Sequence, residues 1–422
     1  MKYLLAAFCF TATVTAFVSA DFGDSGAKIS ATAPVASSSS ASTGSVRRII
    51  VSAWADRNVQ LYLSLIFSTF FGIATYIYFF LYRRFSGMLP AITSTHQLHA
   101  FMRYVGSTEE DERLRCRDHL AVMYIPALLR DYVESSWGLF GLSRWMINYV
   151  LSSELPGFYE LVVARTHWFD QEFQTYLQLN HLRGQDGQSV KQVVVLGSGY
   201  DTRLLRFKEL IISNNIEAFE VDKAEVLKMN RGILEKNEWS MKHIRSVPCD
   251  LAKDDLETEL VKNGFKTDLP TLFMFEGVAS FLPDARVNRI LSFIGHAAGM
   301  GSVVCMDYVK LAADQKRFGH VGYMEFRRFI EARGDTIQFF GNSPGIGMFL
   351  REHNAGMLKG MHKNRLQQLL WRVDGKHSGS VAPYIDCISF QVGYLPKLNQ
   401  RKLVPRTGDH ETNNQGGSQH DS

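Results

Sequence analysis

The amino-acid sequence predicts an α/β protein built on a mostly parallel sheet, and one change of pattern carries that prediction. Beyond about residue 188, short and nearly continuous apolar runs alternate with stretches of helical periodicity. Such runs are typical of strands buried on both faces, as in parallel sheets that helices cover. We expect these strands at 192–197, 218–222, 271–277, 302–309 and 387–395.

The region in front of this pattern is expected to be helical. From Thr93 to about Gln188, apolar and aromatic residues recur at helical spacing among charged ones. We therefore predict a helical cap over 84–188 and an α/β domain over 189–395. The polar tail at 396–422 is expected to be disordered.

Three further segments are predicted at the N-terminus. Residues 1–20 have the layout of a signal peptide or another targeting leader, and 21–59 form a disordered spacer rich in Ser and Ala. Residues 60–83 contain an uncharged apolar run long enough for a transmembrane helix, with a buried core helix as the alternative. A signal peptide would leave the C-terminal region on the cytoplasmic side of the membrane. An organelle presequence is the alternative.

Composition excludes several classes of function. The chain is 46% hydrophobic, which is enough for a sizeable core, and its net charge is only +4. Because no dense run of Lys and Arg occurs, nucleic acid is not an expected partner. The five cysteines lack CxxC spacing and no cluster of metal-ligand residues appears, so we expect no metal and reduced, buried thiols. The cysteines are Cys9, Cys116, Cys249, Cys305 and Cys387.

The strongest local signal follows the first of these strands. Val193–Leu196 runs into Gly197-Ser198-Gly199 and then into a helix that starts near Thr202. Glycines there let the backbone approach a nucleotide-like ligand, and the helix N-terminus presents free N–H groups. Glu220 ends the next strand, where a carboxylate can accept hydrogen bonds from both hydroxyls of a ribose. The alternative for Glu220 is a capping or surface acid.

The third position of the turn separates two ligand classes. A nicotinamide-binding turn usually has Gly or Ala there for close strand–helix packing. This chain has Thr202, so the turn favours a ligand with one nucleoside and no pyrophosphate, such as S-adenosylmethionine.

Five segments, in order along the chain, point to one family. They are VVVLGSGYDTR, FEVD, VPCDL, LFMFEGVASFL and MDY. With Ala164-Arg165-Thr166 before them, they resemble the leucine carboxyl methyltransferase family over roughly 118–395. The resemblance implies the class I, Rossmann-like methyltransferase fold, a mostly parallel seven-stranded sheet with an N-terminal helical cap, and S-adenosyl-L-methionine as cofactor. Members methylate carboxylates or hydroxyls, including the C-terminal leucine of type 2A protein phosphatases.

The resemblance also implies the roles of the cofactor-binding residues. Arg165 would pair with the methionine carboxylate and Glu276 would face the methionine amino group, while Gly197 and Gly199 form the turn beneath the ligand. Glu220 would hold the ribose hydroxyls, Asp250 would accept from the adenine amine, and Leu251 would supply a backbone contact to the adenine. The chain departs from the family at Val195, where an acid is common, at Phe281, where Tyr is common, and in lacking a clean lysine motif, for which Arg117 or Arg130 could substitute.

The predicted activity is O-methyl transfer from S-adenosylmethionine to a carboxylate or a hydroxyl, on a protein C-terminus, a small molecule or a lipid. A carboxylate acceptor needs no general base, whereas a hydroxyl does. His167 is a candidate base or a structural residue, and no catalytic residue is assigned. The segment 318–347 is expected to shape acceptor specificity or to be ordinary helix packing. The alternative function is a membrane-anchored cofactor-binding protein without turnover.

Overall fold

The computed structural model describes residues 57–86, 91–109, 111–112, 115–134, 142–182, 189–311, 320–341, 343–370 and 379–393. The predicted leader at 1–20, nearly all of the predicted spacer and the predicted tail at 396–422 lie outside the described residues. The chain divides into two compact units, one ending at Tyr76 and the other beginning at Ile77.

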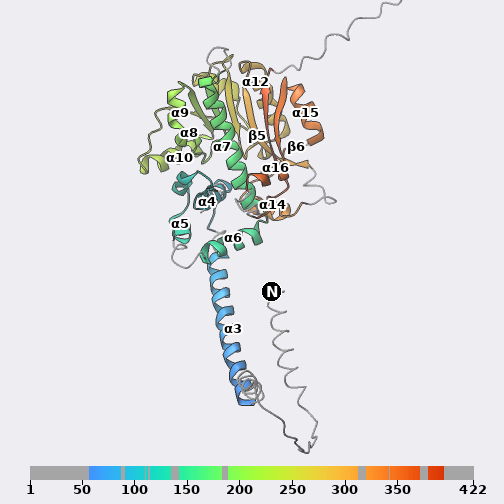
Figure 1. Ribbon diagram of the computed structural model, residues 1–422. Helices are drawn as coiled ribbons and strands as arrows, with labels where there is room; N and C mark the ends of the chain where they lie inside the picture. The colour runs from blue at the N-terminus through green and yellow to red at the C-terminus, as the bar shows by residue number, and fades with distance from the viewer. Residues whose placement is uncertain are drawn as a thin grey trace, which may run out of the picture. The chain divides into compact units, whose positions relative to one another are not determined.

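Eight strands form one sheet in the order β3-β2-β1-β4-β5-β8-β7, and the short β6 pairs with β5 (Figure 1). The strands β1 to β5 run parallel to one another, whereas β8 is antiparallel to both β5 and β7. The bounds are β1 Gln192–Leu196, β2 Glu217–Asp222, β3 Ile244–Pro248, β4 Thr271–Phe275, β5 Val303–Lys310, β6 Phe340–Gly341, β7 Ala355–Met361 and β8 Ile385–Val392.

All five predicted strands are present, as β1, β2, β4, β5 and β8. The sheet is mostly parallel, as predicted, and β8, the last predicted strand, is antiparallel to β5 and to the edge strand β7. Its eight strands exceed the expected seven by the two-residue β6.

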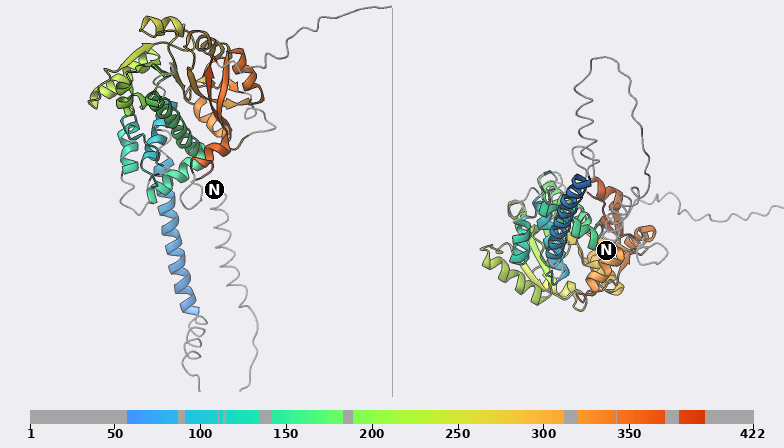
Figure 2. Two further views of the ribbon diagram at one scale, coloured as in Figure 1. Left: turned by 45° about the horizontal axis from the view of Figure 1, so that its top comes forward. Right: turned by 90° about the horizontal axis from the view of Figure 1, so that it is seen from below.

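Two apolar cores explain why the central strands read as continuous apolar runs. On one face, Val193 and Val195 pack in the same cluster as α7 and the cap helices. On the other face, Val194 and Leu196 pack with α11 and α12. Every residue of β1 is therefore buried. In both sets of views α7 lies across the sheet (Figures 1 and 2). The described cysteines are all buried and free, as predicted, at Cys116, Cys249, Cys305 and Cys387.

The predicted helical cap consists of α4 to α7 and one 3-10 turn. Ser94 caps the first of these helices by accepting a hydrogen bond from the backbone N–H of Gln97. The bounds are α4 Thr95–Ser107, η1 His119–Tyr124, α5 Ala127–Glu134, α6 Leu142–Glu154 and α7 Phe158–Leu182. The other helices are α3 Arg57–Ser86, α8 Arg203–Arg206, α9 Lys208–Ser213, α10 Ala224–Lys236, α11 Leu256–Lys262, η3 Ala279–Phe281, α12 Asp284–Ala297, α14 Tyr323–Glu331, α15 Ser343–Glu352 and α16 Lys363–Gln368.

The predicted transmembrane segment at 60–83 falls within α3. Among the described residues, no helix is both long and apolar enough to cross a membrane. The predicted span is therefore not supported by the structure.

Candidate functional site

The turn after β1 has two positions that only glycine fits. Gly197 and Gly199 have φ values of +62° and +47°, in the left-handed region that side chains disfavour. A Cβ on Gly197 would lie 2.5 Å from Cγ2 of Val278, and one on Gly199 would lie 2.8 Å from Cδ2 of His96. The lack of side chains at these two positions thus lets Val278 and His96 pack directly against the turn.

A cleft lies over this turn, at the carboxyl ends of β1 and β4. Its empty volume is ≈ 480 Å³, including space open to solvent. In parallel α/β sheets, ligands bind at these strand ends. The lining residues are His96, His99 and Arg103 from α4, Arg165 from α7, Val195 to Asp201 around the turn, and Glu276 to Val278 after β4.

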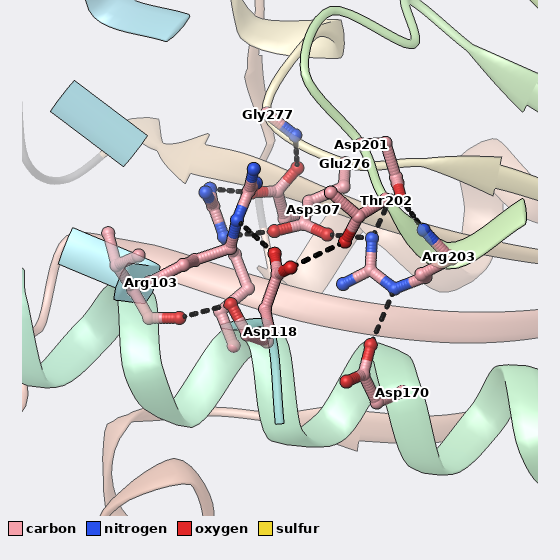
Figure 3. Close-up of polar contacts among 12 residues, drawn as sticks. Arg103, Asp118, Asp170, Asp201, Thr202, Arg203, Glu276, Gly277 and Asp307 are labelled. Atoms are coloured by element: carbon pink, nitrogen blue, oxygen red, sulfur yellow. Dashed lines mark hydrogen bonds and ion pairs between the residues drawn. The ribbon is translucent and has the colours of Figure 1, made fainter. Parts of the chain in front are cut away.

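Arg165 and Glu276, both predicted site residues, form an ion pair across this cleft. Nε of Arg165 lies 2.9 Å from Oε1 of Glu276, and its Nη1 lies 2.7 Å from Oδ2 of Asp307. The other oxygen of Asp307 accepts a hydrogen bond from the backbone N–H of Gly277 (Figure 3). These contacts fix the plane of the guanidinium and leave Nη2, beside Gly277, for a ligand carboxylate.

A second buried arginine, Arg203, forms an ion pair with the other carboxylate oxygen of Glu276. It contacts three carboxylates, with Nε 2.8 Å from Asp170 and Nη1 2.6 Å from Asp201 and 2.7 Å from Glu276. Figure 3 shows Asp170 reaching up from α7 toward Arg203. Arg203 stands in the glycine-rich motif of the sequence, but nothing in the sequence indicated that it would bridge the helix, the turn and β4.

Asp118, in front of η1, joins the cap to the glycine turn. Its Oδ2 lies 2.8 Å from Nε of Arg103, and its Oδ1 accepts a hydrogen bond from the hydroxyl of Thr202. Arg103 also donates to the carbonyl of Tyr200. The cap and the turn are therefore held together by buried polar contacts, which the sequence did not predict.

Burial and the neighbouring arginines decide the pKa values of the carboxyl groups Glu276 and Asp307. Burial raises the pKa of Glu276, but Arg203 and Arg165 outweigh it and hold that pKa below its usual value. Burial dominates at Asp307 and raises its pKa. Glu276 is thus an ionised carboxylate at neutral pH, which suits it to face a ligand ammonium group.

Two of the three acids of β2, Glu220 and Asp222, occupy different places. Glu220 does not line the cleft; it accepts a hydrogen bond from the hydroxyl of Ser246 at 2.5 Å and lines a neighbouring cavity that includes Ser198 and Asp201. Asp222, at the end of the strand, accepts a hydrogen bond at 2.7 Å from the backbone N–H of Gly199. The acid that reaches the glycine turn is therefore Asp222, two residues beyond the predicted one.

Asp250 and Leu251 lie just beyond β3, next to the end of β2. The link is a backbone hydrogen bond from Cys249 to the carbonyl of Asp222. Oδ1 of Asp250 accepts from the backbone N–H of Ala252, and the carbonyl of Leu251 accepts from Arg286. Both residues lie outside the set that lines the cleft, and their contact with the adenine stays a prediction.

Two histidines bear on the search for a catalytic base. His167, the candidate from the sequence, is half-buried on α7 and is absent from the lining of the cleft. His99, on α4, lines the cleft and is half-buried, and its buried Nε2 atom has no hydrogen-bond partner among the described residues. No sequence signal marked His99, because it lies in an amphipathic helix without a motif.

Comparisons with known proteins agree with the expected enzyme class and cofactor. A family model described as leucine carboxyl methyltransferase matches residues 98–295. The chain is 28% identical over 177 residues to a Mycolicibacterium smegmatis protein and 31% identical over 157 residues to one from Mycolicibacterium gilvum. Both carry the name "Putative S-adenosyl-L-methionine-dependent methyltransferase".

These matches cover part of each protein. They take in 42% and 36% of this chain and 50% and 47% of the relatives, so the chain spans about half the length of the curated relatives it matches. Among solved structures, a Thermobifida fusca methyltransferase structure is 17% identical, with a TM-score of 0.42, over 60% of this chain and 90% of that chain. A DUF574 family protein from Streptomyces avermitilis is 12% identical, with a TM-score of 0.43, over 72% and 99%.

Proposed function

We propose that this chain binds S-adenosylmethionine in the cleft over Gly197 and transfers its methyl group to a carboxylate or hydroxyl oxygen. One observation carries the proposal: the glycine turn after β1 and the Arg165–Glu276 pair line one cleft, and the carboxylate of Asp222, at the end of β2, holds that turn through the backbone N–H of Gly199. Binding sites of parallel α/β sheets occur at the carboxyl ends of the strands, where this cleft lies.

The residues present fit such a ligand. Because Gly197 and Gly199 lack side chains, Val278 and His96 can pack against the turn as walls of the cleft. Nη2 of Arg165 would bind the methionine carboxylate, and the ionised Glu276 would bind the methionine ammonium group. Asp250 and Leu251 would contact the adenine. A bound sulfonium donor supplies an activated methyl group, so the chain has mainly to orient the reactants and exclude water.

For the ribose, the geometry favours Asp222 over Glu220. Each oxygen of Asp222 accepts one backbone hydrogen bond, from Gly199 and from Lys223. A carboxylate has about four lone-pair sites, so it retains capacity for two ribose hydroxyls. The role of Glu220 stays a prediction, which the experiment below also tests.

Substrate and location belong to the proposal as well. A protein C-terminal leucine is one candidate acceptor, since the matching family model is named for it. Small molecules and lipids are the others. A membrane as partner and a cytoplasmic catalytic domain stay predictions from the sequence. The competing function is binding of the cofactor without turnover.

Calorimetric titration with S-adenosylhomocysteine tests the cofactor site. We expect wild-type protein to bind it, and Asp222→Asn to weaken binding about tenfold or more through lost charge-assisted hydrogen bonds. Glu220→Gln serves as the matched variant, and we expect it to change the affinity by about threefold at most. Wild-type protein that does not bind would overturn the proposed function. A larger loss in Glu220→Gln than in Asp222→Asn would return the ribose contact to Glu220.

A further inference from the structure

A second cavity adjoins the cleft and has an apolar wall. Its empty volume is ≈ 320 Å³, including open space, and it shares His99, Arg165, Gly277 and Val278 with the cleft. It is thus placed where an acceptor would meet the methyl donor. The remaining lining residues are Phe158, Ser280, Phe281, Asp307, Tyr308, Val309, Phe326 and Ile385. Phe326 belongs to the segment expected to shape specificity, and Phe281 supplies an apolar ring where the family commonly has Tyr.

His99 stands between the two spaces. Its ring lies 5.6 Å from that of Phe158, and Nε2 is buried without a partner among the described residues. An unpaired polar atom buried in this way costs free energy unless a ligand satisfies it. Burial, together with Arg165, Arg103 and His96, lowers the pKa of His99 well below the usual value. The imidazole is therefore neutral at physiological pH and can accept a hydrogen bond at Nε2.

The charges around the second cavity disfavour an ionised acceptor. Among the described residues that line it, Arg165 is the one arginine or lysine. Its Nε and Nη1 are held by Glu276 and Asp307, and Nη2 is the group that the proposed function assigns to the cofactor carboxylate. A carboxylate acceptor would enter an apolar space beside Asp307 without a cation of its own, which is unfavourable.

We propose that the acceptor is an apolar compound bearing a hydroxyl group, a phenol or an alcohol, which donates its O–H to Nε2 of His99. The inference rests on the proposed function, because it needs the donor in the adjoining cleft. In the step, the bond from the acceptor oxygen to the methyl carbon forms as the methyl–sulfur bond breaks. Sulfur keeps that electron pair, and the hydroxyl proton passes to Nε2. The imidazolium then releases the proton to solvent.

The experiment uses the full chain, labelled S-adenosylmethionine and two probes of one shape, 2-naphthol and 2-naphthoic acid. We expect methyl transfer to 2-naphthol, at least about tenfold faster than to the acid, since a buried polar group discriminates strongly between ligand groups. His99→Gln keeps a polar group near the position of Nε2 but cannot take the proton. Its kcat with 2-naphthol should fall about 10²- to 10⁴-fold, while its affinity for S-adenosylhomocysteine stays within about threefold.

His119→Gln is the matched control, because His119 is an exposed histidine on η1; we expect its kcat to stay within about twofold of wild type. Three results would overturn the inference: faster transfer to the acid, no transfer to either probe by protein that binds S-adenosylhomocysteine, or full kcat in His99→Gln. Protein that fails to bind S-adenosylhomocysteine at all would instead overturn the proposed function, so the two failures are distinguishable.

Discussion

At the scale of single residues, the cleft depends on groups whose neighbours leave them little freedom. Gly197 faces Val278 so closely that a methyl group would collide with it. Arg203 is 2% exposed and makes ion pairs with three carboxylates. Its planar guanidinium can point donors in several fixed directions, which a lysine cannot do. A conservative change at either residue is therefore expected to disturb the site.

Gly197→Ala tests this close fit. The added methyl group would collide with Val278, and alanine would have to adopt the positive φ that Gly197 has. We expect this strain to destabilise the native turn by about 1–3 kcal/mol. We expect affinity for S-adenosylhomocysteine to fall at least about tenfold, as measured by calorimetric titration. Gly232→Ala is the control. Gly232 lies on α10, and an added Cβ would meet no atom of the other described residues within 4 Å. The substitution should therefore leave the affinity unchanged and stabilise the helix by about 0.5–1 kcal/mol. Unchanged affinity in Gly197→Ala would contradict the expectation.

At the scale of elements, the cap is coupled to the turn after β1 through buried charge. The side chain of Asp118 is 1% exposed, and its oxygens contact Arg103 at 2.8 Å and Arg206 at 3.5 Å as well as Thr202. These partners come from α4, α8 and the turn itself. Movement of the cap away from the sheet would leave several buried charges unpaired. Contact between the cap and the turn after β1 is therefore favoured.

Asp118→Asn is the corresponding prediction. Removing the charge takes the buried carboxylate away from Arg103, while Arg206 keeps its pair with Asp170. We expect the free energy of unfolding in urea to fall by about 3–5 kcal/mol. Glu259→Gln, which breaks the exposed pair with Lys262, should change it by less than about 1 kcal/mol. Equal effects of the two substitutions would mean that Asp118 does not couple the cap to the turn.

At the scale of the whole α/β unit, two apolar cores lie on opposite faces of one sheet. The cleft lies at the carboxyl ends of the central strands β1 and β4. Trp168 and Phe169 of α7 belong to one core, and Ile290 and Leu291 of α12 to the other. A ligand in the cleft contacts groups carried by the cap as well as by the sheet. Its binding energy is therefore expected to stabilise the fold as a unit.

Thermal unfolding measures this linkage. S-adenosylhomocysteine at 100 times its Kd should add about 2.7 kcal/mol of stability and raise Tm by several degrees, with a further rise at each increase in concentration. NADH is the control ligand, because the turn at Thr202 does not suit a dinucleotide, and it should leave Tm unchanged. A rise with NADH alone would favour a nicotinamide site.

The sequence by itself determined the features that depend on residues close together in the chain, namely the strands and the glycine turn. Apolar runs located β1, β2, β4, β5 and β8, because a strand buried on both faces must be apolar along its length. The glycines after Leu196 marked the turn, because their backbone conformation excludes side chains whatever surrounds them. The order of motifs indicated the enzyme class with which the comparisons agree.

Only the tertiary structure decided how distant groups pair. The direction of β8 is not encoded in its own apolar pattern, since parallel and antiparallel strands buried on both faces look alike. Glu220 and Asp222 are separated by one residue, and only the packing of the turn decides which of them meets Gly199. The pKa of His99 is lowered first by burial and next by Arg165 of α7, with a contribution from Arg103 and His96 on its own helix. Pairing and burial arise between segments, so no local pattern can specify them.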